Sequence, residues 1–111
     1  MNRVWRRGDI CWCELEKKRP VVILTRDGLI PHLQNVTVAP LTTRVRGVAS
    51  QVTLETFDGV VERCAVSLDN LQTVPKDSLG DFISSLTRTR LREIQRAMIF
   101  SLELDIFDPM A

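Results

Sequence analysis

Two short stretches of the sequence carry side chains that could bind a phosphate group. In VAPLTTR (residues 38–44), two hydroxyls and a guanidinium follow an apolar run and a proline. In KKRP (residues 17–20), three cations precede another apolar run. A guanidinium offers five N–H donors in a fork that fits two phosphate oxygens, and a threonine hydroxyl can donate one more hydrogen bond. Residue type alone leaves another interpretation open, because arginines before strands are usually solvated and threonine pairs are common in turns.

The three cysteines do not form a recognisable metal or redox motif. Cys11 and Cys13 are two residues apart, which places them on the same face of a strand, and Cys64 is distant in the sequence. This spacing differs from the C-x-x-C of redox and zinc sites, and the chain has a single histidine. We therefore expect three buried free thiols and no metal site.

Composition indicates one globular domain spanning residues 1–111. Hydrophobic residues make up 44% of the chain and charged residues 26%, which suits a folded protein rather than a disordered one. No stretch approaches the roughly 20 apolar residues that span a bilayer, and no apolar signal region follows the basic N-terminus, so we expect a cytoplasmic protein without membrane contact. Residues 1–46 carry nine Lys/Arg against four Asp/Glu, whereas residues 47–111 carry six against ten. This asymmetry is compatible either with a polyanion bound to the first half or with chance segregation on a solvated surface.

Hydrophobic periodicity predicts several strands followed by a C-terminal helix. Short apolar or alternating runs predict strands over residues 10–15, 20–24, 35–39, 51–55 and 64–68, the third of them ending at Pro40. Residues 29–33 are expected to form a loop, and 76–80 a helical turn closed by glycine. The final helix is expected to begin at Thr87 or Thr89 and to carry an apolar stripe of Leu91, Ile94, Met98 and Leu102. The fold class is therefore mostly β with a C-terminal helix, a small α+β or barrel-plus-helix domain.

Four motifs in sequence resemble the MazF/PemK-type toxin family. They are the opening RGDICWCEL, the run RPVVIL, the segment VAPLTT and the segment LDNLQTV. The corresponding family pattern is an R-G-D/E opening with tryptophan, then R-P-V-V-V-L, then P-[L/I]-T, then D-Q/N-[L/V], and finally a helix. Each motif alone is weak, but their order and spacing cover nearly the whole chain.

The resemblance implies a fold, an activity and partners. The fold would be a small, twisted antiparallel barrel similar to SH3 and CcdB, working as a homodimer. Family members mostly cleave single-stranded RNA without a metal or cofactor, leaving 2′,3′-cyclic phosphate and 5′-hydroxyl ends and so inhibiting translation and growth. A cognate acidic antitoxin holds them inactive. The family's catalytic arginine and threonine correspond to Arg19 and Thr42, with Thr43 directly adjacent.

This chemistry fits the residues in part. Transfer of a proton from an attacking 2′-hydroxyl is often the work of a histidine pair, but the single histidine, His32, excludes a two-histidine mechanism. Arg19 is suited to stabilising charge on the phosphorane, since a guanidinium is effectively never deprotonated, and its part in proton transfer is left open. Thr42 can donate to a non-bridging oxygen.

Further residues are candidates for RNA binding. Lys17, Lys18, Thr43 and Arg44 could contact the RNA backbone, which gives salt-dependent affinity with little sequence information. Asn70 stands where many members carry glutamine, and it could bind a base edge or cap a turn. Of Trp5 and Trp12, which could stack on bases, at least one is expected to lie in the core or a dimer interface instead.

The segment before Arg19 is shorter than in most family members. A Gly/Ser-rich loop is replaced by ELEKK (residues 14–18), which indicates a short-loop variant. A second hypothesis is therefore a non-catalytic, CcdB-like toxin that binds a protein such as DNA gyrase, and a third is an inert or regulatory module paired with its antitoxin. The presence of both Arg19 and Thr42 favours the ribonuclease.

Overall fold

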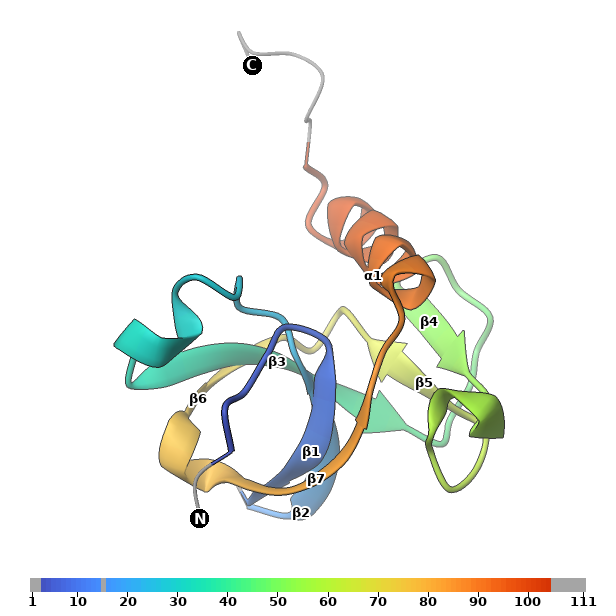
Figure 1. Cartoon of the computed structure of the whole chain (residues 1–111). Helices are drawn as coiled ribbons and strands as arrows, with labels where there is room; N and C mark the ends of the chain where they lie inside the picture. Colours follow the sequence, from blue (N-terminus) through green and yellow to red (C-terminus); the bar gives the residue numbers. More distant parts are fainter. Residues whose placement is uncertain (1–2, 15, 105–111) are drawn as a thin grey trace, which may run out of the picture.

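The computed structural model describes residues 3–14 and 16–104 and contains one antiparallel sheet with a helix packed on it (Figure 1). The strands are β1 (Asp9–Glu14), β2 (Lys18–Ile23), β3 (Asn35–Thr42), β4 (Gln51–Leu54), β5 (Cys64–Ser67), β6 (Gln72–Pro75) and β7 (Leu79–Ser85). Three single 3₁₀ turns are η1 (Ile30–His32), η2 (Thr56–Asp58) and η3 (Lys76–Ser78), and the C-terminal helix is α1 (Arg88–Ser101). The predicted mostly-β fold with a C-terminal helix is confirmed.

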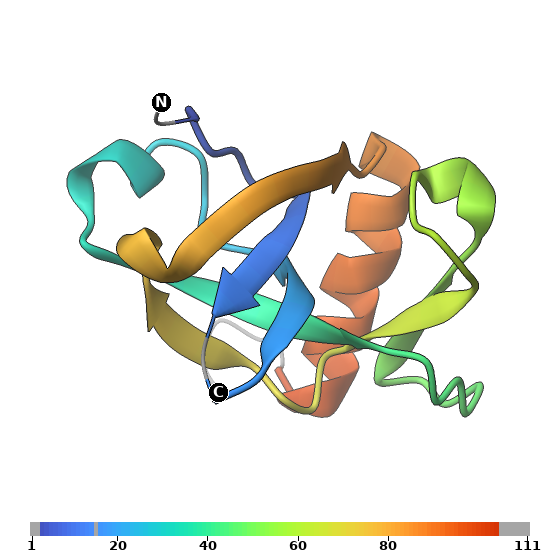
Figure 2. The same ribbon diagram turned by 90° about the horizontal axis from the view of Figure 1, so that it is seen from below.

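The sheet is strongly curved. Its strand order is β4-β5-β3-β2-β1-β7, and β6 also pairs with β3. Within residues 3–14 and 16–104 the two end strands, β4 and β7, do not pair with each other, so the sheet curls without closing into the expected barrel. Figure 2 shows α1 running between the curled part of the sheet and the part formed by β4 and β5.

β3 is longer than the sequence predicts. Our prediction ended this strand at Pro40, but it continues to Thr42. Pro40 pairs with Val21 of β2, and on the other edge of β3 it lies between the pairing with β6, which ends at Val38, and the pairing with β5, which begins at Leu41. A residue without an N–H is tolerated between two ladders, so proline does not end the strand here.

Two strands and two short turns were missed or misjudged. β6 is short and ends in proline, and β7 is largely exposed, so neither shows the alternation that identifies a half-buried strand. β7 is held by β1 through a ladder with two register shifts. The segment expected as a loop contains η1, and the turn predicted over 76–80 is shorter, since η3 ends at Ser78 and Gly80 belongs to β7.

The central strands bury both faces. Ile10 of β1 and Val22 of β2 belong to a core cluster that also contains Ile94 of α1. Their strand neighbours Cys11 and Val21 belong to a second cluster inside the curled part of the sheet. Alternate residues of β1 and β2 therefore serve different cores, which is why these strands show continuous apolar runs.

Helix α1 begins at the expected place. The Thr87 hydroxyl accepts a hydrogen bond from the Arg90 N–H at 3.2 Å, as an N-cap should. Ile94 is fully buried, and the Ser101 hydroxyl donates to the carbonyl oxygen of Leu68 at 3.0 Å. Leu102 was expected in the apolar stripe but is 52% exposed, because it lies just beyond the last helical residue.

A partly buried ion pair fastens the start of α1 to η2. The Arg90 guanidinium donates two hydrogen bonds of 3.0 Å to the carboxylate of Asp58, whose side chain is 4% exposed. Burial by itself raises the pKa of Asp58, but the hydrogen bonds from Arg90 and from the Glu55 N–H outweigh it, and the pKa lies below its usual value of 3.8. The pair joins elements that are far apart in the sequence.

This ion pair gives a pH-dependent contribution to stability. Because the pKa of Asp58 is lower in the folded chain, its contribution is present above about pH 4 and is lost as the pH falls through the folded pKa. Asp58→Asn should lower the free energy of unfolding by about 1–3 kcal/mol at pH 7, and the difference from wild type should shrink in acid. Urea titrations across pH test this. Asp81→Asn, at an exposed carboxylate, should show neither effect.

The cysteines are free and buried, as predicted. Burial, reinforced by neighbouring Cys13 and Asp9, raises the pKa of Cys11 to about 12, and burial also raises the pKa of Cys64. Because all three thiols are buried, they should resist alkylation in the native protein and react only after unfolding. Mass spectrometry of iodoacetamide-treated protein with and without denaturant measures this. Rapid native labelling of Cys11 would contradict the structure.

Candidate active site

The two candidate catalytic residues lie at the same end of neighbouring strands. Val21 of β2 pairs with Pro40 of β3, and the strands are antiparallel. If the same antiparallel register is extended by two residues along each strand, Arg19 falls opposite Thr42. On its other edge Thr42 pairs with Ala65 of β5, so β3 is held at this end by a separate strand.

The loop after β3 is held by its own hydrogen bonds. The Thr42 hydroxyl oxygen accepts from the Arg44 N–H at 3.1 Å, which leaves the hydroxyl hydrogen free to donate. Gln51 of β4 fastens the same loop at two points: its Oε1 accepts from the Arg46 N–H at 2.8 Å, and its Nε2 donates to the Arg44 carbonyl at 3.2 Å. Sequence reasoning missed Gln51, because one glutamine in an alternating strand gives no signal.

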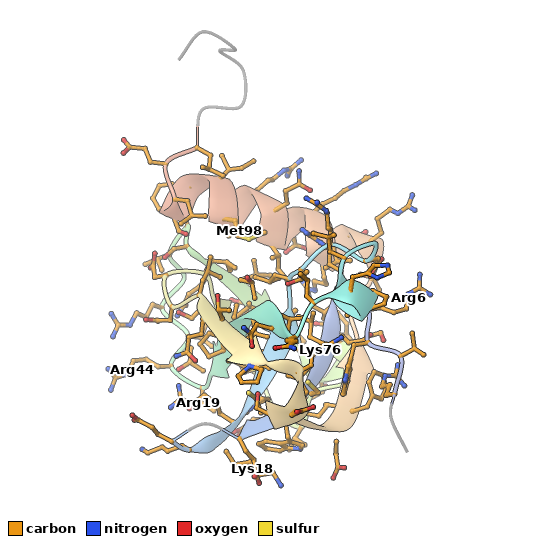
Figure 3. The ribbon with its side chains drawn as sticks, turned by 90° about the vertical axis from the view of Figure 1, so that its left-hand side faces the viewer. Arg6, Lys18, Arg19, Arg44, Lys76 and Met98 are labelled. Carbon is orange, nitrogen blue, oxygen red and sulfur yellow. The ribbon has the colours of Figure 1, made fainter. Side chains whose placement is uncertain are left out.

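Cationic side chains surround these two residues. Figure 3 shows Arg44 and Arg19 on one side of the molecule, with Lys18 at the lower end of the same side. Lys17, Lys18, Arg19 and Arg44 are exposed, and none forms a salt bridge within the described residues. Lys18 also lies 5.6 Å from the centre of the Trp12 ring. The side chains are therefore available to a polyanion.

Asn70 caps a turn beside β3. Its Nδ2 donates to the Ser67 hydroxyl at 2.8 Å, and its backbone N–H donates to the Ser67 carbonyl at 3.4 Å. The sequence left Asn70 open between capping a turn and binding a base, and the capping contact is present. Asn70 is exposed, so its amide oxygen remains accessible.

An apolar hollow of about 510 Å³ adjoins Thr42. It provides a surface on which a flat ring could rest, and Trp12 forms part of it while being only partly buried. Trp5, by contrast, packs against the core inside the curled sheet. Glu62 is the one carboxylate in the lining, which consists of Ile10, Trp12, Pro20, Leu41, Thr42, Thr43, Val60, Val61, Glu62, Cys64 and Ile83.

The histidine of the chain lies at the other end of β3 from Thr42. His32 ends η1, before the first residue of β3, whereas Thr42 is the last residue of that strand. Among residues 3–14 and 16–104 no group of three or more His, Cys, Asp or Glu side chains could hold a metal ion. No helix in the same residues is long and apolar enough to cross a membrane. The β2–β3 register directs the Arg19 guanidinium and the Thr42 hydroxyl to this end of the sheet, and Glu62 lines the hollow that includes Thr42.

Comparisons with known proteins agree on one family. The family described as PemK-like, MazF-like toxin of type II toxin-antitoxin system matches residues 6–102. Endoribonuclease MazF3 of Mycobacterium tuberculosis is 44% identical over 92 residues, covering 83% of this chain and 89% of the relative. The probable endoribonuclease MazF5 of the same organism is 42% identical over 101 residues, covering 88% and 93%.

Solved structures give the same result. The Mycobacterium tuberculosis toxin MazF-mt6 superposes with a TM-score of 0.83 at 42% identity, covering 87% of this chain and 98% of that one. A mycobacterial endoribonuclease in complex with its cognate antitoxin superposes with a TM-score of 0.84 at 27% identity, covering 91% and 97%.

The contacts of Gln51 predict its effect on the loop after β3. Gln51→Ala removes both side-chain bonds, so hydrogen exchange of the Arg46 amide should accelerate by about 2–10-fold, the equivalent of one net hydrogen bond. NMR-detected exchange measures this. Thr53→Ala, on the same strand, should leave the rate unchanged. Equal acceleration in both variants would mean that β4 as a whole, rather than the Gln51 amide, orders the loop.

Proposed function

The chain belongs to the family of PemK-like, MazF-like toxins of type II toxin–antitoxin systems and is an endoribonuclease, and on that premise we propose how it cuts RNA. The substrate is single-stranded RNA, cleaved at selected sequences by attack of its own 2′-hydroxyl without a metal ion. The products carry a 2′,3′-cyclic phosphate and a 5′-hydroxyl. Arg19 and Thr42 are the catalytic residues.

The proposal rests on the register of β2 and β3. It directs Arg19 and Thr42 to the same end of the sheet, where Thr42 has an unused hydroxyl hydrogen and Arg19 has no acidic partner among the described residues. A guanidinium and a hydroxyl at one point can together hold the non-bridging oxygens of one phosphate. A toxin that only bound a protein would need no such arrangement.

The reaction adds charge to the phosphate, and these donors act on that charge. The 2′-oxygen attacks phosphorus, the 5′-oxygen leaves, and the intermediate phosphorane carries more negative charge on its non-bridging oxygens than the substrate does. Arg19 donates in a fork to two of these positions and Thr42 donates to one. A preorganised donor of this kind contributes on the order of 3 kcal/mol to the transition state.

Proton transfer needs further groups. The proton of the 2′-hydroxyl passes to Glu62, the carboxylate that lines the hollow beside Thr42, and the leaving 5′-oxygen takes a proton from water. The hydroxide that remains then takes the proton from Glu62, which restores the water and the carboxylate. Arg19 keeps its proton throughout, as a guanidinium does in proteins.

The surrounding residues bind the RNA on either side of the cut. Lys17, Lys18, Thr43 and Arg44 contact phosphates, and the amide oxygen of Asn70 accepts a hydrogen bond from a base. The hollow beside Trp12 receives a neighbouring base. This division assigns affinity to the cations and sequence selection to Asn70 and the hollow.

Two partners complete the proposal. A second copy of the chain forms a homodimer, and a cognate acidic antitoxin covers the cationic side and blocks it; one structural relative is described in complex with its cognate antitoxin. In the cytoplasm the free toxin cleaves RNA, which inhibits translation and growth.

Cleavage in the presence of EDTA tests the reaction. Wild type should cut a long single-stranded RNA into discrete fragments with 5′-hydroxyl ends, and Arg19→Ala and Thr42→Ala should each lower kcat by about 10²–10³-fold. Glu62→Gln tests the proton acceptor. Arg26→Ala is the matched control, because Arg26 is an exposed guanidinium that follows β2 at the end of the strand opposite to Arg19.

Other results would change the assignment. Loss of cleavage on chelation would remove the metal-independent mechanism. Full activity of Arg19→Ala would remove the central role of the guanidinium. A wild-type protein that cleaves no RNA but binds gyrase would support the CcdB-like alternative.

A further inference from the structure

A second group of arginines lies away from Arg19 and Thr42. It consists of Arg88 and Arg92 of α1 together with Arg7 from the segment before β1, which line one hollow, and we call it the arginine surface. Figure 3 shows Arg6, the residue before Arg7, on the side of the molecule opposite Arg19 and Arg44. The proposed cleavage site makes no use of these residues.

The fold brings the two segments together through Gly8. Its φ is +92°, and a Cβ at this position would lie 3.0 Å from Cδ2 of Leu91, so only glycine allows the chain to pass this close to α1. Next to it, Arg7 is anchored by a hydrogen bond of 3.0 Å from Nη1 to the Leu24 carbonyl. The result is a hollow of about 620 Å³ lined by Arg7, Arg88, Leu91, Arg92 and Gln95.

The cations of this surface outnumber the carboxylate beside it. Arg7, Arg88 and Arg92 form no salt bridge within the described residues, whereas Arg90, on another face of the same helix turn, pairs with Asp58 and Glu93. The nearby carboxylate is that of Asp27, whose Oδ1 accepts from the Arg7 backbone N–H at 2.6 Å. The first turn of α1 contains no acidic residue, and its N–H groups already carry partial positive charge. Arg88 and Arg92 are also four residues apart, a spacing at which like charges repel.

Repulsion among these cations makes the folded chain less stable, and a bound anion would reduce that repulsion. We propose that the arginine surface binds the phosphate backbone of the RNA substrate outside the segment that is cut, an inference that rests on the proposed function. Arginine forks suit phosphate oxygens, and residues four apart on a helix lie about 6 Å apart along its axis, comparable to the distance between successive phosphates. RNA that reaches both sites is held more tightly than RNA that reaches only the first.

The lining favours RNA over an acidic peptide. A peptide that becomes ordered on a surface needs apolar anchor points, and among the described residues that line this hollow Leu91 is the only apolar one. The same residues include no aromatic ring on which a base could stack, so the contacts are with phosphates and carry no sequence preference.

The test compares two RNAs that share one cleavage sequence. One is a short oligonucleotide limited to that sequence, and the other extends it by several tens of nucleotides on both sides. For Arg88→Gln/Arg92→Gln, we expect KM on the long RNA to rise about 10-fold and KM on the short RNA to stay unchanged, with kcat unaffected on both. A plot of the logarithm of the binding constant for long RNA against the logarithm of the salt concentration should become less steep. The slope should change by about 0.7 for each phosphate that the variant no longer neutralises.

Matched variants separate this effect from misfolding and general charge. Arg88→Lys/Arg92→Lys should restore part of the affinity, and Arg63→Gln, which removes one exposed cation elsewhere, should leave the ratio of the two KM values at the wild-type value. Binding is measured separately in the Arg19→Ala background, so that the long RNA stays intact.

The outcomes also separate this inference from the proposed function. If the double variant weakens binding of short and long RNA equally, or of neither, the inference is overturned. It is likewise overturned if the variant binds long RNA normally but loses affinity for an acidic peptide. Failure of wild type to cut the short RNA contradicts the proposed function, while long-RNA binding in the inactive background still decides whether the arginine surface holds RNA.

Discussion

The position of β3 is the constraint on which the rest of the structure depends. One edge of this strand pairs with β2, and the other pairs first with β6 and then with β5. A strand held on both edges cannot shift its register without breaking both ladders, so Thr42 has a defined place. The same pairing leaves the end of β3 open to solvent beside the end of β2, and a phosphate site requires such an opening.

The chemistry of the site follows from what the chain lacks as well as from what it holds. The one histidine in the sequence, His32, lies before the first residue of β3, and its being single excludes a mechanism with two histidines. A guanidinium and a hydroxyl at the proposed centre act on charge rather than on protons. In the proposed mechanism, the stabilisation of this charge depends on how rigidly the donors are held, which would give Gln51 and the ladder from β5 to β3 a part in function although neither touches the substrate.

Arginine serves two different purposes in this fold. Arg90 is partly buried and bound to two carboxylates, so its charge is used in joining α1 to η2. Arg19 at the proposed site and Arg88 on the helix have no such partner within the described residues. An arginine that already pairs with a carboxylate in the fold has little to offer an anionic ligand. Whether an arginine is paired therefore says more about its function than its position in the sequence does.

The sequence by itself determined the β-rich class, the helix with its cap at Thr87 or Thr89, the buried cysteines and the candidate pair Arg19 and Thr42. These depend on local periodicity, on capping chemistry and on motifs that lie within short stretches. It did not determine β6, β7, the continuation of β3 through Pro40 or the role of Gln51, because these are stabilised by partners distant along the chain. The tertiary structure alone decided that Arg7 lies beside Arg88, since Gly8 must first pass against Leu91 before the two segments can meet.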